Sequence, residues 1–228
     1  VLRGEYLANS VCVCMDCHSQ RDWNIFGAPI KAGTFAGGGE KFDRTMQFPG
    51  EFYSKNITPF ALGTWTDGEI YRAITSGVSK DGHPFFPVMP YPNYNTMATE
   101  DVYSIIAYLR TLGPLETKPY PESEIDFPVN LIMRTMPEPA HPQERPAMTD
   151  PNYGEYMTNA AACIECHTRS EKGKKIGADL AGGFVFSFPN GSIVRSSNIT
   201  PHPTDGIGAW DKATFIARFK EYSDSSYV

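Results

Sequence analysis

The sequence predicts a mainly α-helical protein in which two tandem copies of one small domain are joined by a proline-rich linker and the second copy is truncated. Three observations predict this organisation. One cysteine and histidine motif occurs twice, the residues around it also recur, and apolar residues fall at helical intervals while no long run alternates between apolar and polar. The predicted ranges are 1–113 for the first domain, 114–150 for the linker and 151–228 for the second domain.

The first two helical patterns lie in the first half of the first domain. Apolar residues at helical spacing between Leu2 and Val11 predict a short amphipathic helix that leads into the first motif. Thr66 and Glu69 have the spacing of a capping box, which predicts a helix that begins there and ends at Gly77.

The longest helix is predicted near the end of the first domain. Thr99 is the expected N-cap, with Glu100 and Asp101 in the first turn. An apolar stripe follows, and Gly113 and Pro114 end the pattern. The loops between the helices are rich in glycine and proline, so they need a large apolar group to pack on.

The linker is defined by its composition. Residues 114–150 contain eight prolines among 37 residues, and seven acidic side chains against three basic ones. Proline at this density predicts an extended segment without helix. The segment is expected to pack along a domain surface through a group of apolar residues, namely Phe127, Val129, Leu131, Ile132 and Met133.

The repeated motif reads Cys-x-x-Cys-His and occurs at residues 14–18 and 163–167. This is the signature of c-type haem attachment, in which two thiols bond to one porphyrin and the adjacent histidine binds its iron. The sequence therefore predicts two covalently bound haem c groups. The predicted thioether cysteines are Cys14, Cys17, Cys163 and Cys166, and the predicted axial ligands within the motifs are His18 and His167.

Other cysteine sites fit the pattern less well. Two zinc knuckles would lie about 15 to 20 residues apart, and these motifs are far more distant in the sequence. A redox pair of the thioredoxin type would explain neither the histidine nor the repetition. The fifth cysteine, Cys12, breaks the motif spacing; it is expected to be a buried thiol, with pairing between chains as the alternative.

The motifs sit in matching surroundings. Asparagine and tryptophan recur at equivalent places in both copies, and two interpretations are open for them. They could line the haem edges and reach the propionates through amide and indole N–H groups, or they could be loop caps and core aromatics. The four residues are Asn56, Trp65, Asn198 and Trp210.

A second axial ligand for the first haem is predicted at Met89. This methionine stands between Pro87 and Pro90, which favour a stiff extended loop that can hold a thioether in place. The alternatives in the first domain are Met46, Met97 and His83.

The second copy does not show an equivalent methionine. The position that corresponds to Met89 is expected near 234, beyond Val228, and no methionine follows Met157. The distal ligand of the second haem is therefore expected outside this sequence, with His202 as the alternative within it.

The composition excludes several classes of protein. The formal net charge of −6 repels phosphate backbones, so nucleic-acid partners are not expected. No apolar run approaches the ~18 residues that cross a bilayer. A membrane association would therefore run through a segment outside this chain.

Together these features resemble a known family. The two haem motifs, the Asn-Ile-Thr-Pro loops, and the Pro-x-Met-Pro-Tyr segment before a helix ending Ala-Tyr-Leu-Arg-Thr-Leu are similar to those of tandem class I cytochromes c. Within that family they resemble the cytochrome c subunits of bacterial alcohol and gluconate dehydrogenases. The resemblance implies helical cytochrome c domains in the periplasm or on a membrane facing it, with His18 and His167 as proximal ligands and Met89 as a distal one.

The resemblance also implies partners. A dehydrogenase or other respiratory donor would supply electrons, and a quinone, an oxidase or a downstream cytochrome would accept them. Well-known members carry three haems where this chain shows two motifs. We predict a non-catalytic electron-transfer subunit. The alternative is a peroxidase-like di-haem enzyme whose second haem opens to substrate, with His202 and Arg195 as the acid-base candidates.

Overall fold

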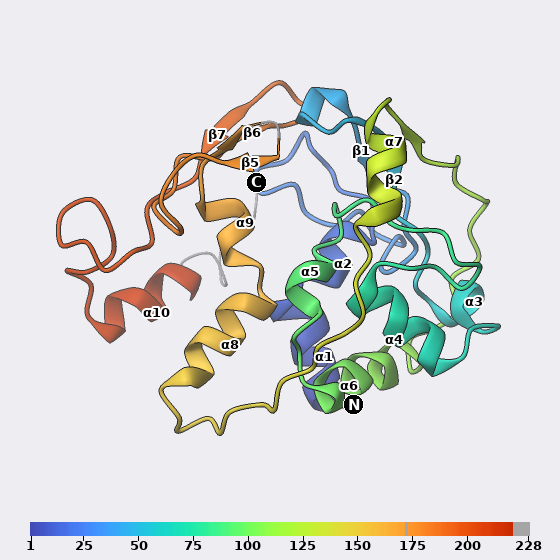
Figure 1. Ribbon diagram of the computed structural model, residues 1–228, viewed down its shortest axis with the longest axis horizontal. Helices are drawn as coiled ribbons and strands as arrows, with labels where there is room; N and C mark the ends of the chain where they lie inside the picture. Colours follow the sequence, from blue (N-terminus) through green and yellow to red (C-terminus); the bar gives the residue numbers. More distant parts are fainter. Residues whose placement is uncertain (172, 221–228) are drawn as a thin grey trace. The chain divides into compact units, whose positions relative to one another are not determined.

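The computed structural model describes residues 1–171 and 173–220 (Figure 1). The chain forms two units, each with its own internal contacts. Unit 1 contains Val1–Arg21 and Ile30–Ala162, and unit 2 contains Asp22–Pro29 and the chain from Cys163 onward. Helix predominates over strand, as predicted. Among the described residues, no helix is both long and apolar enough to cross a membrane.

Unit 1 holds most of the helices and one small antiparallel sheet with strand order β1-β2-β3. Its elements are α1 (Leu2–Tyr6), η1 (Leu7–Val11), α2 (Cys14–Cys17), β1 (Lys41–Phe42), η2 (Arg44–Met46), β2 (Gly50–Tyr53), α3 (Pro59–Leu62), α4 (Asp67–Ser76), α5 (Tyr91–Tyr94), α6 (Thr99–Leu109), β3 (Glu124–Ile125), α7 (Val129–Ile132), η3 (Met133–Thr135) and α8 (Asn152–Ala160).

The described residues of unit 2 form two short helices and two antiparallel strand pairs, β4 with β5 and β6 with β7. Its elements are α9 (Cys163–His167), β4 (Ser170–Glu171), β5 (Lys174–Lys175), β6 (Val185–Ser187), β7 (Ile193–Arg195) and α10 (Lys212–Lys220). The strands found among the described residues are two to four residues long. Such short strands leave no alternating pattern long enough to see in the sequence.

Helices α1 and α6 pack closely against one another in unit 1 (Figure 1). Gly4 allows this contact, because a Cβ at that position would collide with the backbone carbonyl of Ser104. The apolar stripe of α6 is buried as predicted, with Val102, Ile105 and Ile106 each at most 1% exposed. Part of the core of unit 1 therefore lies where α1, near the start of the chain, packs against α6.

The predicted capping box is confirmed. The Thr66 hydroxyl accepts a hydrogen bond from the Glu69 backbone, and the Glu69 carboxylate accepts one from the Thr66 backbone. Helix α4 then ends at Gly77, which has a left-handed conformation. The N-cap predicted at Thr99 is wrong by one residue, because Ala98 is the last extended residue before α6.

The segment predicted as a linker is grouped with unit 1. The Asn56 side chain donates to the carbonyl of Leu115 at 2.8 Å and to the hydroxyl of Thr117 at 3.0 Å. The Tyr120 hydroxyl donates to the carbonyl of Gly37 at 3.0 Å, and β3 extends the sheet beside β2. These bonds fasten the first part of the segment as a strap across unit 1.

The prediction that this segment contains no helix is wrong. Helix α7 and the turn η3 form between Pro128 and Pro137, the one long stretch of the segment without proline. Met133 is buried there, whereas Phe127 is 78% exposed and the other apolar residues of the group also remain accessible. Local freedom from proline, together with one buried side chain, is enough to form a short helix.

Helix α8 also packs within unit 1. The Tyr156 hydroxyl donates to Asp101 at 2.8 Å and accepts a hydrogen bond from the Ala98 backbone. Asn159 donates to the Asn93 carbonyl and to the Thr96 hydroxyl, both at 3.0 Å. The boundary between the units thus falls after α8, whereas the division into two haem domains with a linker stays a prediction.

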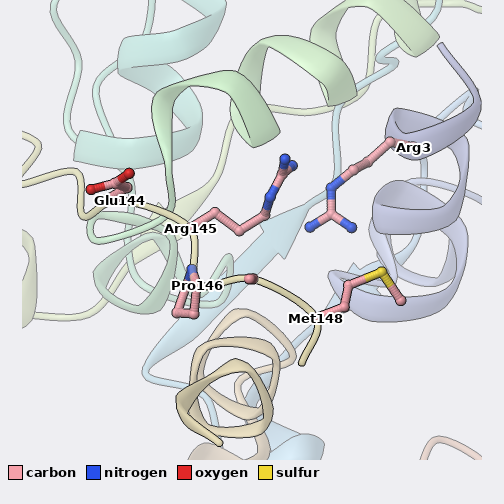
Figure 2. A pocket seen from close by; sticks show the side chains of 6 residues that line it. Arg3, Glu144, Arg145, Pro146 and Met148 are labelled. Carbon is pink, nitrogen blue, oxygen red and sulfur yellow. The ribbon is translucent and has the colours of Figure 1, made fainter. Parts of the chain in front are cut away.

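Asp101 is fully buried and is held by two arginines. Arg3 donates to it through two nitrogens, at 2.7 and 2.6 Å, and Arg145 donates at 2.6 Å. Figure 2 shows the two guanidinium groups extending toward one another beside a hollow of about 410 Å³. None of the residues that line this hollow belongs to a Cys-x-x-Cys-His motif.

Candidate haem-attachment sites

The first motif lies on a single helical turn. Val13 has a left-handed backbone conformation, with φ of 44°, and it reverses the chain immediately before α2. Cys14 and Cys17 are three residues apart on that turn, so their side chains project on one side. The His18 backbone N–H closes the turn with a hydrogen bond to the Cys14 carbonyl at 2.9 Å.

The second motif has the same local design. Ala162 has φ of 50°, and α9 follows it at once. Cys163 and Cys166 again stand three residues apart on one turn. All five cysteines lie within the described ranges, and none of them forms a disulfide.

The two motif histidines are oriented identically. The Nδ1 atom of His18 lies 2.7 Å from the carbonyl oxygen of Lys55, and the Nδ1 atom of His167 lies 2.7 Å from that of Ser197. A carbonyl oxygen can only accept a hydrogen bond, so Nδ1 carries the proton in each ring. In the neutral imidazole this leaves Nε2 with a free lone pair, which is the state that binds a metal.

The loops that follow the motifs also repeat. The Gly38 N–H donates to the His18 carbonyl at 2.7 Å, and the Gly182 N–H donates to the His167 carbonyl at 2.6 Å. Both glycines need positive φ, and a Cβ would meet backbone atoms at either position. Three further pairs of residues match between the copies. Ala36 and Leu180 both have positive φ, and Ser19 and Thr168 both have buried hydroxyls. The backbone N–H of Ser54 donates to the Glu40 carbonyl, as that of Ser196 does to the Phe184 carbonyl.

The recurring asparagines cap the Asn-Ile-Thr-Pro loops. In each copy the side-chain carbonyl accepts from the backbone and the hydroxyl of the threonine two residues later, at 2.8 and 2.7 Å. The Asn56 amide nitrogen also donates to the Leu115 carbonyl and to the Thr117 hydroxyl. This geometry matches the loop-capping interpretation for both Asn56 and Asn198, while a role at the haem edge stays a prediction for both.

The recurring tryptophans differ in environment. Trp65 is half-buried and packs against the core of unit 1, where Arg110 donates to its carbonyl at 2.6 Å. Trp210 is 39% exposed, and the Arg218 guanidinium lies 5.8 Å from its ring centroid. Each stands just before a helix whose first turn is capped by a side chain, Thr66 in α4 and Asp211 in α10.

Burial sets the protonation of the first motif. It raises the pKa of the Cys14 thiol to about 12, so this group is a neutral thiol near pH 7. Burial also lowers the pKa of His18 below its ordinary value, although the bond to the Lys55 carbonyl opposes the shift. A neutral His18 imidazole beside the protonated Cys14 thiol is the form that can join a porphyrin and its iron.

Met89 and Cys14 both pack against the core cluster of unit 1. Among the alternatives, Met97 is 1% exposed and its sulfur lies 3.9 Å from that of Cys12, so it is a core residue. Met46 lies in the turn η2, and His83 is exposed in a loop. Met89 therefore stays the predicted distal ligand.

In unit 2, His202 has a local structural role. Its Nδ1 atom accepts hydrogen bonds from the backbone N–H groups of Thr204 and Asp205, at 3.4 and 3.1 Å. In the neutral ring this places the proton on Nε2, which removes the lone pair an iron would need. Arg195 is exposed at the end of β7. The position expected for a distal methionine, near 234, lies outside the described residues.

The residues around both motifs fit a covalently attached haem. Each offers two thiols and a correctly protonated imidazole on one turn. Unit 2 also offers many accessible apolar side chains, whereas Ala28 is the one buried apolar residue among its described residues. A large apolar group held by the motif would give that unit a core. Its accessible apolar residues include Ile193, Val194, Phe215, Ile216 and Phe219.

Sequence reasoning missed the residues that orient the histidines. Lys55 and Ser197 act through backbone carbonyls, so their side chains carry no signal. Both nevertheless stand directly before the repeated Asn-Ile-Thr-Pro loops, and that position could have identified them. Tyr94, whose hydroxyl donates to the Cys12 carbonyl at 3.0 Å, was also missed.

The chain is similar in sequence to several known proteins. No protein-family model matches the chain. It is 31% identical over 225 residues to the fructose dehydrogenase cytochrome subunit of Gluconobacter japonicus, which covers 92% of this chain and 42% of that protein. It is 30% identical over 248 residues to the gluconate 2-dehydrogenase cytochrome c subunit of Pantoea cypripedii, covering 100% and 52% respectively.

A third relative is named a diheme cytochrome c-type, from Cereibacter sphaeroides, with 28% identity over 165 residues that cover 68% of this chain and 53% of that protein. The chain thus spans about half the length of the curated relatives it matches. Homology over most of this chain, with two motifs of matching geometry, identifies it as a homologue of the cytochrome c subunits of bacterial fructose, alcohol and gluconate dehydrogenases.

Proposed function

We propose that the chain is the di-haem part of a cytochrome c subunit that carries electrons away from a dehydrogenase. Cys14 and Cys17 would hold the first haem, and Cys163 and Cys166 the second. The observation that carries the proposal is the paired histidine geometry, with each Nδ1 bonded to a backbone carbonyl and each Nε2 free.

The chemistry of the group explains why such residues suffice. Bound haem supplies a one-electron iron couple, and the protein sets its potential through the axial ligands and its surroundings. Here His18 and His167 would provide the proximal ligands. Met89 would provide the distal ligand of the first haem, and a histidine and methionine pair raises the potential. No group of this chain has to form or break a substrate bond.

The names of the relatives support the partners. Each named dehydrogenase relative is a subunit of a larger enzyme, so a dehydrogenase is the donor we propose for this chain. A quinone, an oxidase or a further cytochrome would accept the electrons. We propose that the chain works in the bacterial periplasm or on a membrane facing it, as the resemblance of its sequence implies.

The test is an optical spectrum of the oxidised and the reduced protein, with and without carbon monoxide. A closed electron carrier should be low-spin at the first haem and should show no carbon monoxide complex there. Turnover of peroxide at a second haem that binds carbon monoxide would replace the carrier with the peroxidase-like enzyme. A first haem that binds carbon monoxide would contradict Met89 as its distal ligand. Protein without haem absorption would overturn both functions.

A further inference from the structure

The chain before the first motif contains one residue more than the chain before the second. Nine residues separate Gly4 from Cys14, and eight separate Gly154 from Cys163. The extra residue is absorbed by the π-helical turn η1, in which the Cys12 N–H donates to the Leu7 carbonyl at 2.8 Å. A single-residue insertion in a helix commonly takes this form, frequently at functional sites.

The turn leaves the carbonyl of Cys12 without a helical partner. Cys12 is the last residue with right-handed helical angles, and the left-handed Val13 that follows sends the chain away from the helix axis. In place of a backbone donor, the Tyr94 hydroxyl donates to this carbonyl at 3.0 Å. The bond is buried, and Tyr94 itself is 6% exposed.

Tyr94 reaches this carbonyl from a different element. It is the last residue of α5, which also packs against α4 and α8. Its surroundings include the thiols of Cys12, Cys14 and Cys17, whose proximity adds to the effect of burial in raising the pKa of the phenol. The hydroxyl is therefore a protonated donor next to the attachment cysteines.

The second copy provides the contrast. Ala161 and Ala162 have nearly the same backbone angles as Cys12 and Val13. Within the described residues, however, no tyrosine hydroxyl is bonded to the Ala161 carbonyl. Among the described residues, this hydrogen bond from a tyrosine hydroxyl occurs at the first motif.

We propose that Tyr94 is a positioning residue for haem attachment at the first motif. By holding the Cys12 carbonyl, it fixes the left-handed turn at Val13 from which Cys14 projects. The inference rests on the proposed function, because it concerns how the first haem is joined.

The attachment step itself is a simple addition. The sulfur of each cysteine bonds to one carbon of a haem vinyl group, the vinyl π bond breaks, and the thiol hydrogen moves to the other vinyl carbon. No oxidant or reductant is consumed. The rate of this addition depends on the fraction of time that the thiol lies within reach of the vinyl carbon. A turn that is already formed increases this fraction.

The experiment compares Tyr94→Phe with Tyr91→Phe. Both variants remove one buried hydroxyl from α5. Tyr91 is 2% exposed, and its hydroxyl, unlike that of Tyr94, has no hydrogen-bond partner. Each full chain is expressed with a c-type maturation system under limited haem supply. Mass spectrometry of peptides then gives the haem occupancy of each motif, with the second motif as the internal reference.

In Tyr94→Phe, occupancy of the first motif should fall about threefold or more relative to the second, a change comparable to losing one ordinary hydrogen bond. Tyr91→Phe should keep the native ratio. An unchanged ratio in Tyr94→Phe, or an equal loss at both motifs, would overturn the inference. A native chain without haem on either motif would instead overturn the proposed function, so the two failures are distinguishable.

Discussion

At the scale of single residues, Asp101 is a fully buried charge of unit 1 that two arginines hold. Burial alone would raise its pKa, but hydrogen bonds from Arg3, Tyr156 and Arg145 outweigh burial and hold the pKa below its ordinary value. The carboxylate therefore stabilises the folded state at pH values above its unfolded pKa of ~3.9. That contribution is lost as the pH falls through the lower folded pKa.

Asp101→Asn should lower the free energy of unfolding at pH 7 by about 2 to 3 kcal/mol, since both arginines are partly exposed and screened. The difference from the native protein should shrink below about pH 4. Denaturant unfolding at several pH values measures both effects. Asp67→Asn is the matched control. The Asp67 side chain, which pairs with Arg110, is 57% exposed, so this substitution should lower the free energy of unfolding by less than about 1 kcal/mol. Equal losses in the two variants at pH 7 would contradict this assignment.

Met89 is the residue whose proposed role is most readily tested. Met89→Ala should leave the first haem with one axial ligand, so that this haem binds carbon monoxide and its midpoint potential falls. The measurement is a carbon monoxide difference spectrum together with a redox titration. Met46→Ala is the control and should give the native spectrum. A first haem that stays inert to carbon monoxide in Met89→Ala, or reacts in Met46→Ala, would assign the ligand elsewhere.

At the scale of elements, the repeat offers a matched pair of glycines. Gly4→Ala should destabilise the protein by about 3 kcal/mol or more, because its Cβ would collide with the Ser104 backbone where α1 crosses α6. Gly154→Ala, at the equivalent place in α8, should be neutral or stabilising by up to about 1 kcal/mol, since no atom lies within 4 Å of its Cβ. Thermal unfolding of both variants measures the contrast. A similar loss in both would mean that the environment of Gly154 resembles that of Gly4.

Some elements could be predicted from the sequence because their signals are local. The capping box at Thr66 and the apolar stripe of α6 need only a few neighbouring residues. Helix α7 could not be predicted, because it depends on a gap between prolines and on the burial of Met133, which the sequence pattern alone does not show. The same holds for the packing of α8 on unit 1, which relies on Tyr156 reaching Asp101.

The candidate site divides in the same way. The cysteines and histidines are visible because the motif is contiguous. The carbonyls of Lys55 and Ser197, and the hydroxyl of Tyr94, are contributed across 30 to 82 positions of sequence separation. Such partners follow from the three-dimensional path of the loops, which residue types alone do not specify.

At the scale of the whole molecule, the two units differ in what supports them. Unit 1 has a continuous apolar core, whereas among the described residues of unit 2 the apolar side chains are mostly accessible. Blocking attachment in unit 2 with Cys163→Ala and Cys166→Ala should therefore make residues 163–220 much more sensitive to protease than residues 1–162. Cys14→Ala with Cys17→Ala is the matched control, and unit 1 should lose less protection because its core remains. Equal sensitivity of the two units in both double variants would contradict a haem-dependent second unit.

The central claim is that both motifs carry a covalent haem in the same chain. The measurement that tests it most directly is the intact mass of the native protein, expressed with a c-type maturation system and denatured before analysis. We expect the mass of the polypeptide plus the masses of two haem groups. Each haem should stay on its peptide until the thioether bonds are cleaved. A mass with one haem or none would contradict it.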